Sequence, residues 1–206
     1  MRVPERLSSV EAAPLLCAGL TTYKALTRIG AHPGALVAVQ GIGGLGHLAL
    51  QYAGKLGYRV AAVARGTGKA ELAAGLGADH YVDSSADDPG TALRDLGGAA
   101  AIIATAASGA SMSALLPGLA PGGHMVVVGA APDPLTVNTA DLIFGTRTLG
   151  GSLTGTPIEN EDNLAFSVQR GIRSMNEVVP LTEAPKAYER MMAGEARFRM
   201  VLDVTA

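Results

Sequence analysis

The sequence predicts an α/β fold in which helices cover both faces of a doubly wound parallel sheet. From Ala35 onward, short apolar runs alternate with stretches of helical periodicity, which is typical of repeated strand–helix–strand units. Hydrophobic residues make up 48 % of the 206 residues, but aromatic residues only 4 %, so the core must be aliphatic, as suits buried parallel strands. The 27 glycines indicate tight turns and close backbone approaches.

The first half of the chain contains three expected strands, each a short apolar run followed by glycine or polar residues. Between residues 45 and 56 apolar side chains recur at helical spacing, and Gly57 ends that helix. Polar residues 83–88 followed by Pro89-Gly90 predict a loop. The expected strands are Leu36–Val39, Arg59–Val63 and Tyr81–Val82. The expected helices are Ala13–Leu26 after an extended lead-in, Leu45–Leu56 and Lys69–Leu76.

The second half repeats the pattern and completes a six-stranded sheet. Pro121-Gly122-Gly123 predicts a turn before the fifth strand. Thr182 is a plausible N-cap for the last helix, because its hydroxyl can accept from a free backbone N–H. The expected strands are Ala99–Ala104, Met125–Val128, Thr148–Leu153 and a terminal Phe198–Val204. The expected helices are Met112–Leu119, Glu159–Arg170 and Glu183–Met192, the last forming a short helix–strand extension with the terminal strand.

A glycine motif, G-x-G-x-x-G, spans Gly41 to Gly46 between the first strand and its helix. In that context Gly41 permits a tight turn, Gly43 lets the backbone approach a pyrophosphate, and Gly46 lets helix and strand pack closely. Gly44 and Leu45 complete the turn, whose free N–H groups face the anion at the positive end of the helix. The motif predicts a Rossmann domain over residues 29–175 that binds a nicotinamide dinucleotide.

The residues after the second strand bear on which dinucleotide binds. NAD-binding domains usually carry an acidic residue about 20 positions after the motif, but this chain has no carboxylate there before Glu71. Arg65 is suited to pair with a 2′-phosphate, and Lys69, one helical turn on, to assist it. The alternative is that Arg65 is a solvated loop residue. The sequence therefore favours NADP(H), with NAD(H) as the other possibility.

Charge, cysteine content and hydropathy argue against a nucleic-acid partner, a disulfide-bonded fold and a membrane span. The formal net charge is −2 and no basic stripe is present, so we expect no nucleic-acid partner. The single cysteine forms no internal disulfide, which fits a reducing cytoplasm. No apolar run reaches the roughly 18 residues of a membrane span.

Several collinear segments resemble the zinc-dependent alcohol dehydrogenases of the medium-chain superfamily, and together they cover nearly the whole chain. They are Leu16–Gly19, Thr21, Gly41–His47, Leu50–Ala53, Leu76–Asp79, Gly122-Gly123 and Gly194–Val201. The resemblance implies hydride transfer between a nicotinamide cofactor and an alcohol, aldehyde or ketone.

The resemblance also implies roles for individual residues. Cys17 matches a thiolate ligand of the catalytic zinc, whereas the sequence without the resemblance favours an ordinary buried thiol. Arg199 matches a residue that reaches the pyrophosphate. The residues implied to lie near the nicotinamide ring are Thr21, Leu45, Gly129 and Leu153.

The chain departs from the family pattern because most of the catalytic domain, which would precede Met1, is not part of it. Residues 1–28 then form a lead-in and junction helix, and residues 176–206 a remnant of the catalytic domain. A catalytic zinc needs about three protein ligands. The available candidates beside Cys17 are His32, His47, His80 and His124, which we expect to be structural.

Two functional hypotheses therefore stand: an NADP(H)-dependent oxidoreductase of alcohol dehydrogenase type, and an NADP(H)-binding module or partner subunit without turnover. A zinc-free enzyme would need another proton donor, for which Tyr23 and Lys24 are candidates. The expected edge strand Thr148–Leu153 and the apolar face of the last helix also predict a homodimer.

Overall fold

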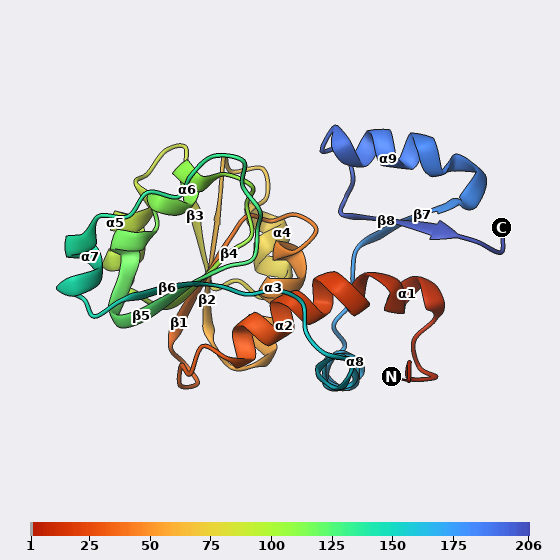
Figure 1. Ribbon diagram of the computed structural model, residues 1–206, viewed down its shortest axis with the longest axis horizontal. Helices are drawn as coiled ribbons and strands as arrows, with labels where there is room; N and C mark the ends of the chain where they lie inside the picture. Colours follow the sequence, from red (N-terminus) through yellow and green to blue (C-terminus); the bar gives the residue numbers. More distant parts are fainter. Residues whose placement is uncertain (1) are drawn as a thin grey trace.

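The computed structural model describes residues 2–206, over which the chain forms a six-stranded parallel sheet and a separate two-stranded parallel sheet (Figure 1). The large sheet has the order β3-β2-β1-β4-β5-β6, so its two halves run outward from β1 and β4. This is the doubly wound Rossmann arrangement, and it confirms the predicted fold class. Its strands are β1 (Leu36–Gln40), β2 (Arg59–Ala64), β3 (His80–Asp83), β4 (Ala99–Ala104), β5 (Leu119–Val127) and β6 (Thr148–Gly151).

The central strands are buried on both faces, which explains why their sequences are continuously apolar. Side chains of β1 alternate between two hydrophobic clusters: Val37 and Val39 face one, Leu36 and Ala38 the other. The helices α2 (Leu20–Thr27), α3 (Gly46–Lys55) and α8 (Pro157–Arg170) contribute to the first cluster. The helices α5 (Pro89–Asp95) and α6 (Gly109–Ser113) contribute to the second. The remaining short helices of the large unit are α4 (Ala70–Gly75) and α7 (Thr139–Ile143).

The stretches at residues 88–95 and 112–123 differ from the sequence prediction. The expected loop at Pro89-Gly90 is helix α5, because the Asp88 carboxylate accepts from the Thr91 N–H at 2.7 Å and Pro89 fits the first helical turn. The expected helix Met112–Leu119 is instead α6 followed by a 3₁₀ turn, Leu116–Gly118. Strand β5 begins directly afterwards, so the expected turn at residues 121–123 lies inside an irregular part of that strand.

The N-terminal helix is interrupted by a π-helical turn. Helix α1 (Ser9–Pro14) begins with a capping box between Ser8 and Glu11, and the π-helix Leu15–Gly19 joins it to α2. The carbonyl of Leu15 accepts from the Asn163 side chain of α8 at 2.9 Å. Tyr52 of α3 donates its hydroxyl to the same Asn163 at 2.6 Å. A buried polar network therefore connects the π-helix, α8 and α3.

The C-terminal residues form a small unit beside the large sheet, with its strands next to α1 (Figure 1). Strands β7 (Asn176–Pro180) and β8 (Arg199–Asp203) pair in parallel, and helix α9 (Ala184–Met192) connects them. The sequence predicted α9 and β8 but not β7. Thr182 is not the N-cap, because it lies in the 3₁₀ turn Leu181–Glu183 and α9 has no side-chain cap. Helix α9 packs through Ala187 on its own small sheet and leaves Tyr188 and Met192 exposed.

Within residues 2–206, the structure contains no helix with the length and apolar character that crossing a membrane requires.

Candidate dinucleotide-binding site

The glycine turn connects the end of β1 to the start of α3. Gly41 has a φ of +85°, which a residue with a side chain rarely adopts. A Cβ atom on Gly46 would lie 1.7 Å from the Gly41 carbonyl oxygen, so this position tolerates no side chain. A Cβ on Gly43 would meet no atom within 4 Å. Two glycines are therefore required by the fold, whereas Gly43 leaves space in front of the turn.

The first turn of α3 faces that space. No side chain caps this end of α3, and the N–H groups of His47 and Leu48 donate to the carbonyls of Gly43 and Leu45. The helix dipole and the N–H group of Gly46, the first residue of the helix, favour an anion. A cavity of about 420 Å³ covers the turn and includes Gly41, Gly43, Gly44 and Leu45 in its lining.

Two cationic side chains from distant parts of the chain also line this cavity. Arg199, the first residue of β8, extends over the turn, and a Cβ on Gly44 would lie 2.8 Å from its Nη1. Lys69 donates from Nζ to the Ile42 carbonyl at 2.8 Å and lies 5.6 Å from the ring centre of Phe198. Burial of the Lys69 amine lowers its pKa, and the nearby Arg197 adds to this effect. The arrangement presents positive charge and backbone N–H groups to one small volume.

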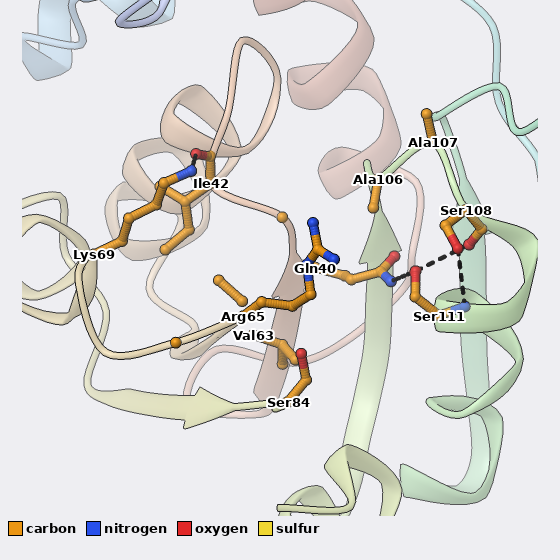
Figure 2. A pocket seen from close by; sticks show the side chains of 13 residues that line it. Gln40, Ile42, Val63, Arg65, Lys69, Ser84, Ala106, Ala107, Ser108 and Ser111 are labelled. Carbon is orange, nitrogen blue, oxygen red and sulfur yellow. Dashed lines mark hydrogen bonds between the residues drawn. The ribbon is translucent and has the colours of Figure 1, made fainter. Parts of the chain in front are cut away.

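A second cavity of about 700 Å³ adjoins the first (Figure 2). Its walls come from the carboxyl ends of β1, β2 and β4 and from the start of α6, the edge at which doubly wound sheets bind ligands. Arg65 lines this cavity just after β2 and is exposed. The Arg65 side chain has no hydrogen bond or ion pair with the protein within residues 2–206. Lys69 lines both cavities.

The loop that carries Arg65 is held by residues at the end of β3. Asp83 accepts from the Gly66 N–H at 2.7 Å, and Tyr81 donates its hydroxyl to the Gly66 carbonyl at 2.5 Å. Hydrogen bonds from Ser85 and from backbone N–H groups lower the pKa of Asp83. The sequence prediction considered only carboxylates before Glu71 and so missed this one, which the sheet brings in from the neighbouring strand.

Gln40 and two serines at the start of α6 also line this cavity, and the sequence prediction missed all three. Ser111 donates its hydroxyl to the Ser108 carbonyl at 3.0 Å and therefore accepts from Gln40 Nε2 at 2.7 Å. This leaves Gln40 Oε1 buried without a partner in the described part of the chain. The sequence signal that could have identified this site was Gln40, a polar residue at the end of the otherwise apolar strand β1.

Except for Leu45, which lines the first cavity, the residues implied to serve a metal or the nicotinamide lie apart from these two cavities. Cys17 is exposed on the π-helix, so the expectation of a buried thiol is wrong. Thr21 is buried on α2, one helical turn further on. Across residues 2–206, no three His, Cys, Asp or Glu side chains gather where they could hold a metal ion. The described residues thus do not fit a zinc site by themselves.

Gly129 and Leu153 lie at the ends of β5 and β6. The Gly129 backbone packs against β4, since a Cβ there would lie 2.5 Å from the Ala106 carbonyl oxygen. Leu153 is 82 % exposed and borders a different hollow, which Lys24 and Arg28 also line. Neither residue lines the two cavities of the glycine turn.

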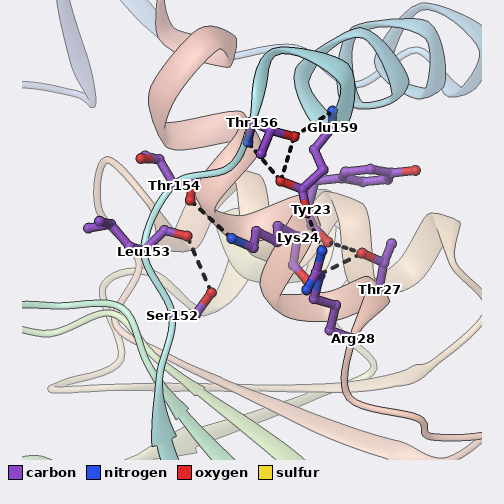
Figure 3. Close-up of polar contacts among 9 residues, drawn as sticks. All are labelled: Tyr23, Lys24, Thr27, Arg28, Ser152, Leu153, Thr154, Thr156 and Glu159. Carbon is purple, nitrogen blue, oxygen red and sulfur yellow. Dashed lines mark hydrogen bonds and ion pairs between the residues drawn. The ribbon is translucent and has the colours of Figure 1, made fainter.

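The alternative proton donors have other partners (Figure 3). Lys24 donates from Nζ to the Thr154 carbonyl at 3.1 Å, and the neighbouring Arg28 pairs with Glu159. The Tyr23 ring packs against Phe166, and burial raises the pKa of its hydroxyl. Both side chains therefore stabilise the packing of α2 against α8 and its preceding segment.

Comparison with known proteins identifies the family. The model of the family "Zinc-binding dehydrogenase" matches residues 44–169, which is more than half of the chain. The chain belongs to this family. The family's curated relatives include alcohol dehydrogenase notN of Aspergillus sp., 41 % identical over 98 % of the chain and 59 % of that protein. An alcohol dehydrogenase of Geobacillus stearothermophilus is 39 % identical over 99 % of the chain and 61 % of its own length.

Solved structures of the family agree with the fold. A cinnamyl alcohol dehydrogenase from Sorghum bicolor superposes with a TM-score of 0.90 at 34 % identity, covering 100 % of the chain and 58 % of that protein. CAD from Helicobacter pylori, solved with NADP(H), superposes with a TM-score of 0.85 at 30 % identity, again covering 100 % and 58 %. The chain thus spans about three-fifths of the length of these relatives.

Proposed function

We propose that this chain binds NADP(H) across the glycine turn and serves hydride transfer between the cofactor and a small alcohol, aldehyde or ketone. The observation that carries the proposal is the convergence of the turn, Lys69 and Arg199 on one cavity that adjoins the Arg65 cavity. The pyrophosphate would bind at the start of α3, with Arg199 above it. When bound, the cofactor supplies or accepts the hydride, and this chain's residues hold and orient it.

The preference for NADP(H) over NAD(H) rests on the exposed Arg65. A guanidinium without a protein partner in the described residues is suited to bind a 2′-phosphate through two parallel hydrogen bonds. Hydrogen bonds from Gly66 and Ser85 hold Asp83 Oδ1 at the base of the loop that carries Arg65. A relative solved with NADP(H) supports the same choice.

The chemistry at the substrate is the part of the proposal that extends beyond these residues. If the chemistry implied by the family resemblance applies, Cys17 would be a single thiolate ligand, and Thr21, Leu45, Gly129 and Leu153 would lie toward the nicotinamide. The second candidate is an NADP(H)-binding module without turnover, which the isolated position of Cys17 favours. Reduction of NADP+ by the purified chain with a small alcohol would support the first candidate, and NADP(H) binding without turnover would support the second. The single cysteine fits a cytoplasmic protein.

We also propose a homodimer through the free edge of β6, which within residues 2–206 pairs with β5 alone. Four apolar side chains at the two ends of this strand are each 69 % exposed or more; they are Ile143, Phe144, Leu153 and Ile158. Antiparallel pairing of two β6 strands about a two-fold axis would satisfy the open backbone groups and set Phe144 near the partner's Leu153. Sedimentation equilibrium should give a dimer for the wild type, a monomer for Phe144→Glu, and a dimer for Val178→Glu on the small sheet.

The deciding experiment is calorimetric titration of the chain with NADPH and, in parallel, NADH. We expect NADPH to bind about tenfold or more tightly than NADH, the difference that one charge-assisted hydrogen-bonded contact makes. Equal affinities would overturn the assignment of Arg65. Binding of neither dinucleotide would overturn the proposed function.

A further inference from the structure

The segment that leads from α8 into the small sheet is attached to α3 by two side chains one helical turn apart. Gln51 exchanges two hydrogen bonds with the Arg173 backbone, at 2.9 and 3.1 Å. His47, which is fully buried, accepts at Nε2 from the Met175 N–H at 3.2 Å. Both side chains hold the same segment, but only His47 also contacts the glycine turn.

His47 also touches the glycine turn. Its Nδ1 lies 2.8 Å from the carbonyl oxygen of Gly43, the residue that faces the proposed pyrophosphate site. A carbonyl only accepts and a backbone N–H only donates, so the imidazole must be neutral, with its proton on Nδ1. A second proton, on Nε2, would set two donors against each other at the Met175 N–H. The other tautomer would do the same there and would also leave Nδ1 and the Gly43 carbonyl as two facing acceptors. The ring therefore bridges the turn and Met175 in one protonation state only.

Met175 links His47 to Arg199, the cationic residue that extends over the turn. Its carbonyl accepts from the N–H groups of both Phe198 and Arg199, each at 3.0 Å. The Phe198 ring stacks on the His47 ring with centres 5.1 Å apart. Arg199 then extends over Gly44. A continuous path of hydrogen bonds thus runs from the Gly43 carbonyl through His47 and Met175 to the backbone of Arg199.

We propose that His47 is a positioning residue that holds Arg199 over the glycine turn and thereby sets the affinity for the pyrophosphate of the dinucleotide. This inference rests on the proposed cofactor site and adds to it a residue that touches no ligand. It assigns a binding role to a side chain that the sequence analysis took as purely structural. Gln51, which holds the same segment without contacting the turn, lacks this role.

The surroundings of the imidazole favour its neutral form. The cationic groups on the elements around it are Arg199 of β8, Arg173 of the connecting segment and Lys69, whose amine lies over Phe198. Burial is the main cause that lowers the pKa of His47 to about 4; the Gly43 hydrogen bond opposes this effect and the Arg199 charge adds to it. The bridge is therefore intact throughout the neutral pH range.

The experiment compares His47→Phe with Gln51→Met. Phenylalanine keeps a ring to stack on Phe198 but lacks both nitrogens, and Gln51→Met removes the matched pair of hydrogen bonds to Arg173. Two ligands are titrated by NMR: NADPH, and adenosine 2′-monophosphate, which has no pyrophosphate and fills only the Arg65 cavity. For His47→Phe we expect the NADPH Kd to rise about tenfold, the worth of about one hydrogen bond. The Kd of adenosine 2′-monophosphate should stay within about twofold, and Gln51→Met should change neither.

Two results would overturn the proposal. One is an NADPH Kd in His47→Phe within about twofold of wild type; the other is an equal loss for both ligands, which would indicate general loosening. Amide hydrogen exchange without ligand separates this proposal from the proposed function. Faster exchange at Arg199 in His47→Phe, but not in Gln51→Met, supports positioning even if wild type binds no NADPH, and unchanged exchange at Arg199 refutes it.

Discussion

Two glycines of the same turn should respond in opposite ways to the addition of one methyl group. Gly46→Ala places a Cβ 1.7 Å from the Gly41 carbonyl oxygen and 2.7 Å from its carbon, both backbone atoms. Gly43→Ala places a Cβ where no protein atom lies within 4 Å, at a φ outside the left-handed region. The first change disrupts the fold of the turn, and the second reaches only the space proposed for the pyrophosphate.

The expected magnitudes follow from these distances. For Gly46→Ala the helix must move about 1.3 Å to restore a contact of roughly 3 Å, and such overpacking costs about 3 kcal/mol or more. In a chain of this size that lowers Tm by roughly 6–12 °C. For Gly43→Ala the folded state meets no clash, and the unfolded chain loses entropy, so stability should be unchanged or rise by up to about 1 kcal/mol. The NADPH Kd should nevertheless rise about tenfold or more, because the methyl group excludes the phosphate.

Differential scanning calorimetry and NADPH titration of both variants test this reasoning. Wild-type affinity in Gly43→Ala would refute the assignment of the space in front of the turn. An unchanged Tm in Gly46→Ala would refute the steric argument for that position.

Three further predictions concern single side chains. Arg65→Ala should weaken NADPH binding by about 1.5–3 kcal/mol and leave NADH binding unchanged in calorimetric titrations; an equal loss for both would contradict the 2′-phosphate role. The pKa of His47 falls from an ordinary 6.5 to about 4 on folding, so between pH 6.5 and 5 only the unfolded chain takes up its proton. Stability should therefore decline as pH falls through that window, with a slope that approaches about 1.4 kcal/mol per pH unit near pH 5, and urea unfolding should show a smaller slope for His47→Phe; equal slopes would refute this. Tyr52→Phe removes the buried donor to Asn163 and should lower the free energy of unfolding in urea by about 2 kcal/mol. Tyr58→Phe is the control: its hydroxyl makes only a 3.4 Å hydrogen bond to the Leu26 carbonyl, so it should cost less than about 0.5 kcal/mol. Equal losses would contradict the network argument.

Elements with strong local signals were predictable from the sequence. Strand β4 has the predicted bounds, Ala99–Ala104, because a fully buried strand is apolar at every position. Helix α5 was missed although its signals are local: Asp88 is an N-cap and Pro89 suits the first turn, but Pro-Gly also indicates a loop. Strand β7 has no comparable local signal, since it exists by pairing with β8 at the far end of the chain.

The sequence by itself determined the fold class and the glycine turn, because both depend on periodicity and on backbone conformations that neighbouring residues specify. Only the tertiary structure decided what surrounds the turn. It brings Arg199 over Gly44, places His47 between Gly43 and Met175, sets Asp83 beside the Arg65 loop, and leaves Cys17 exposed on a π-helix. The physical reason is that hydrophobic periodicity records which face of an element is buried, whereas the packing of distant elements decides which side chains meet.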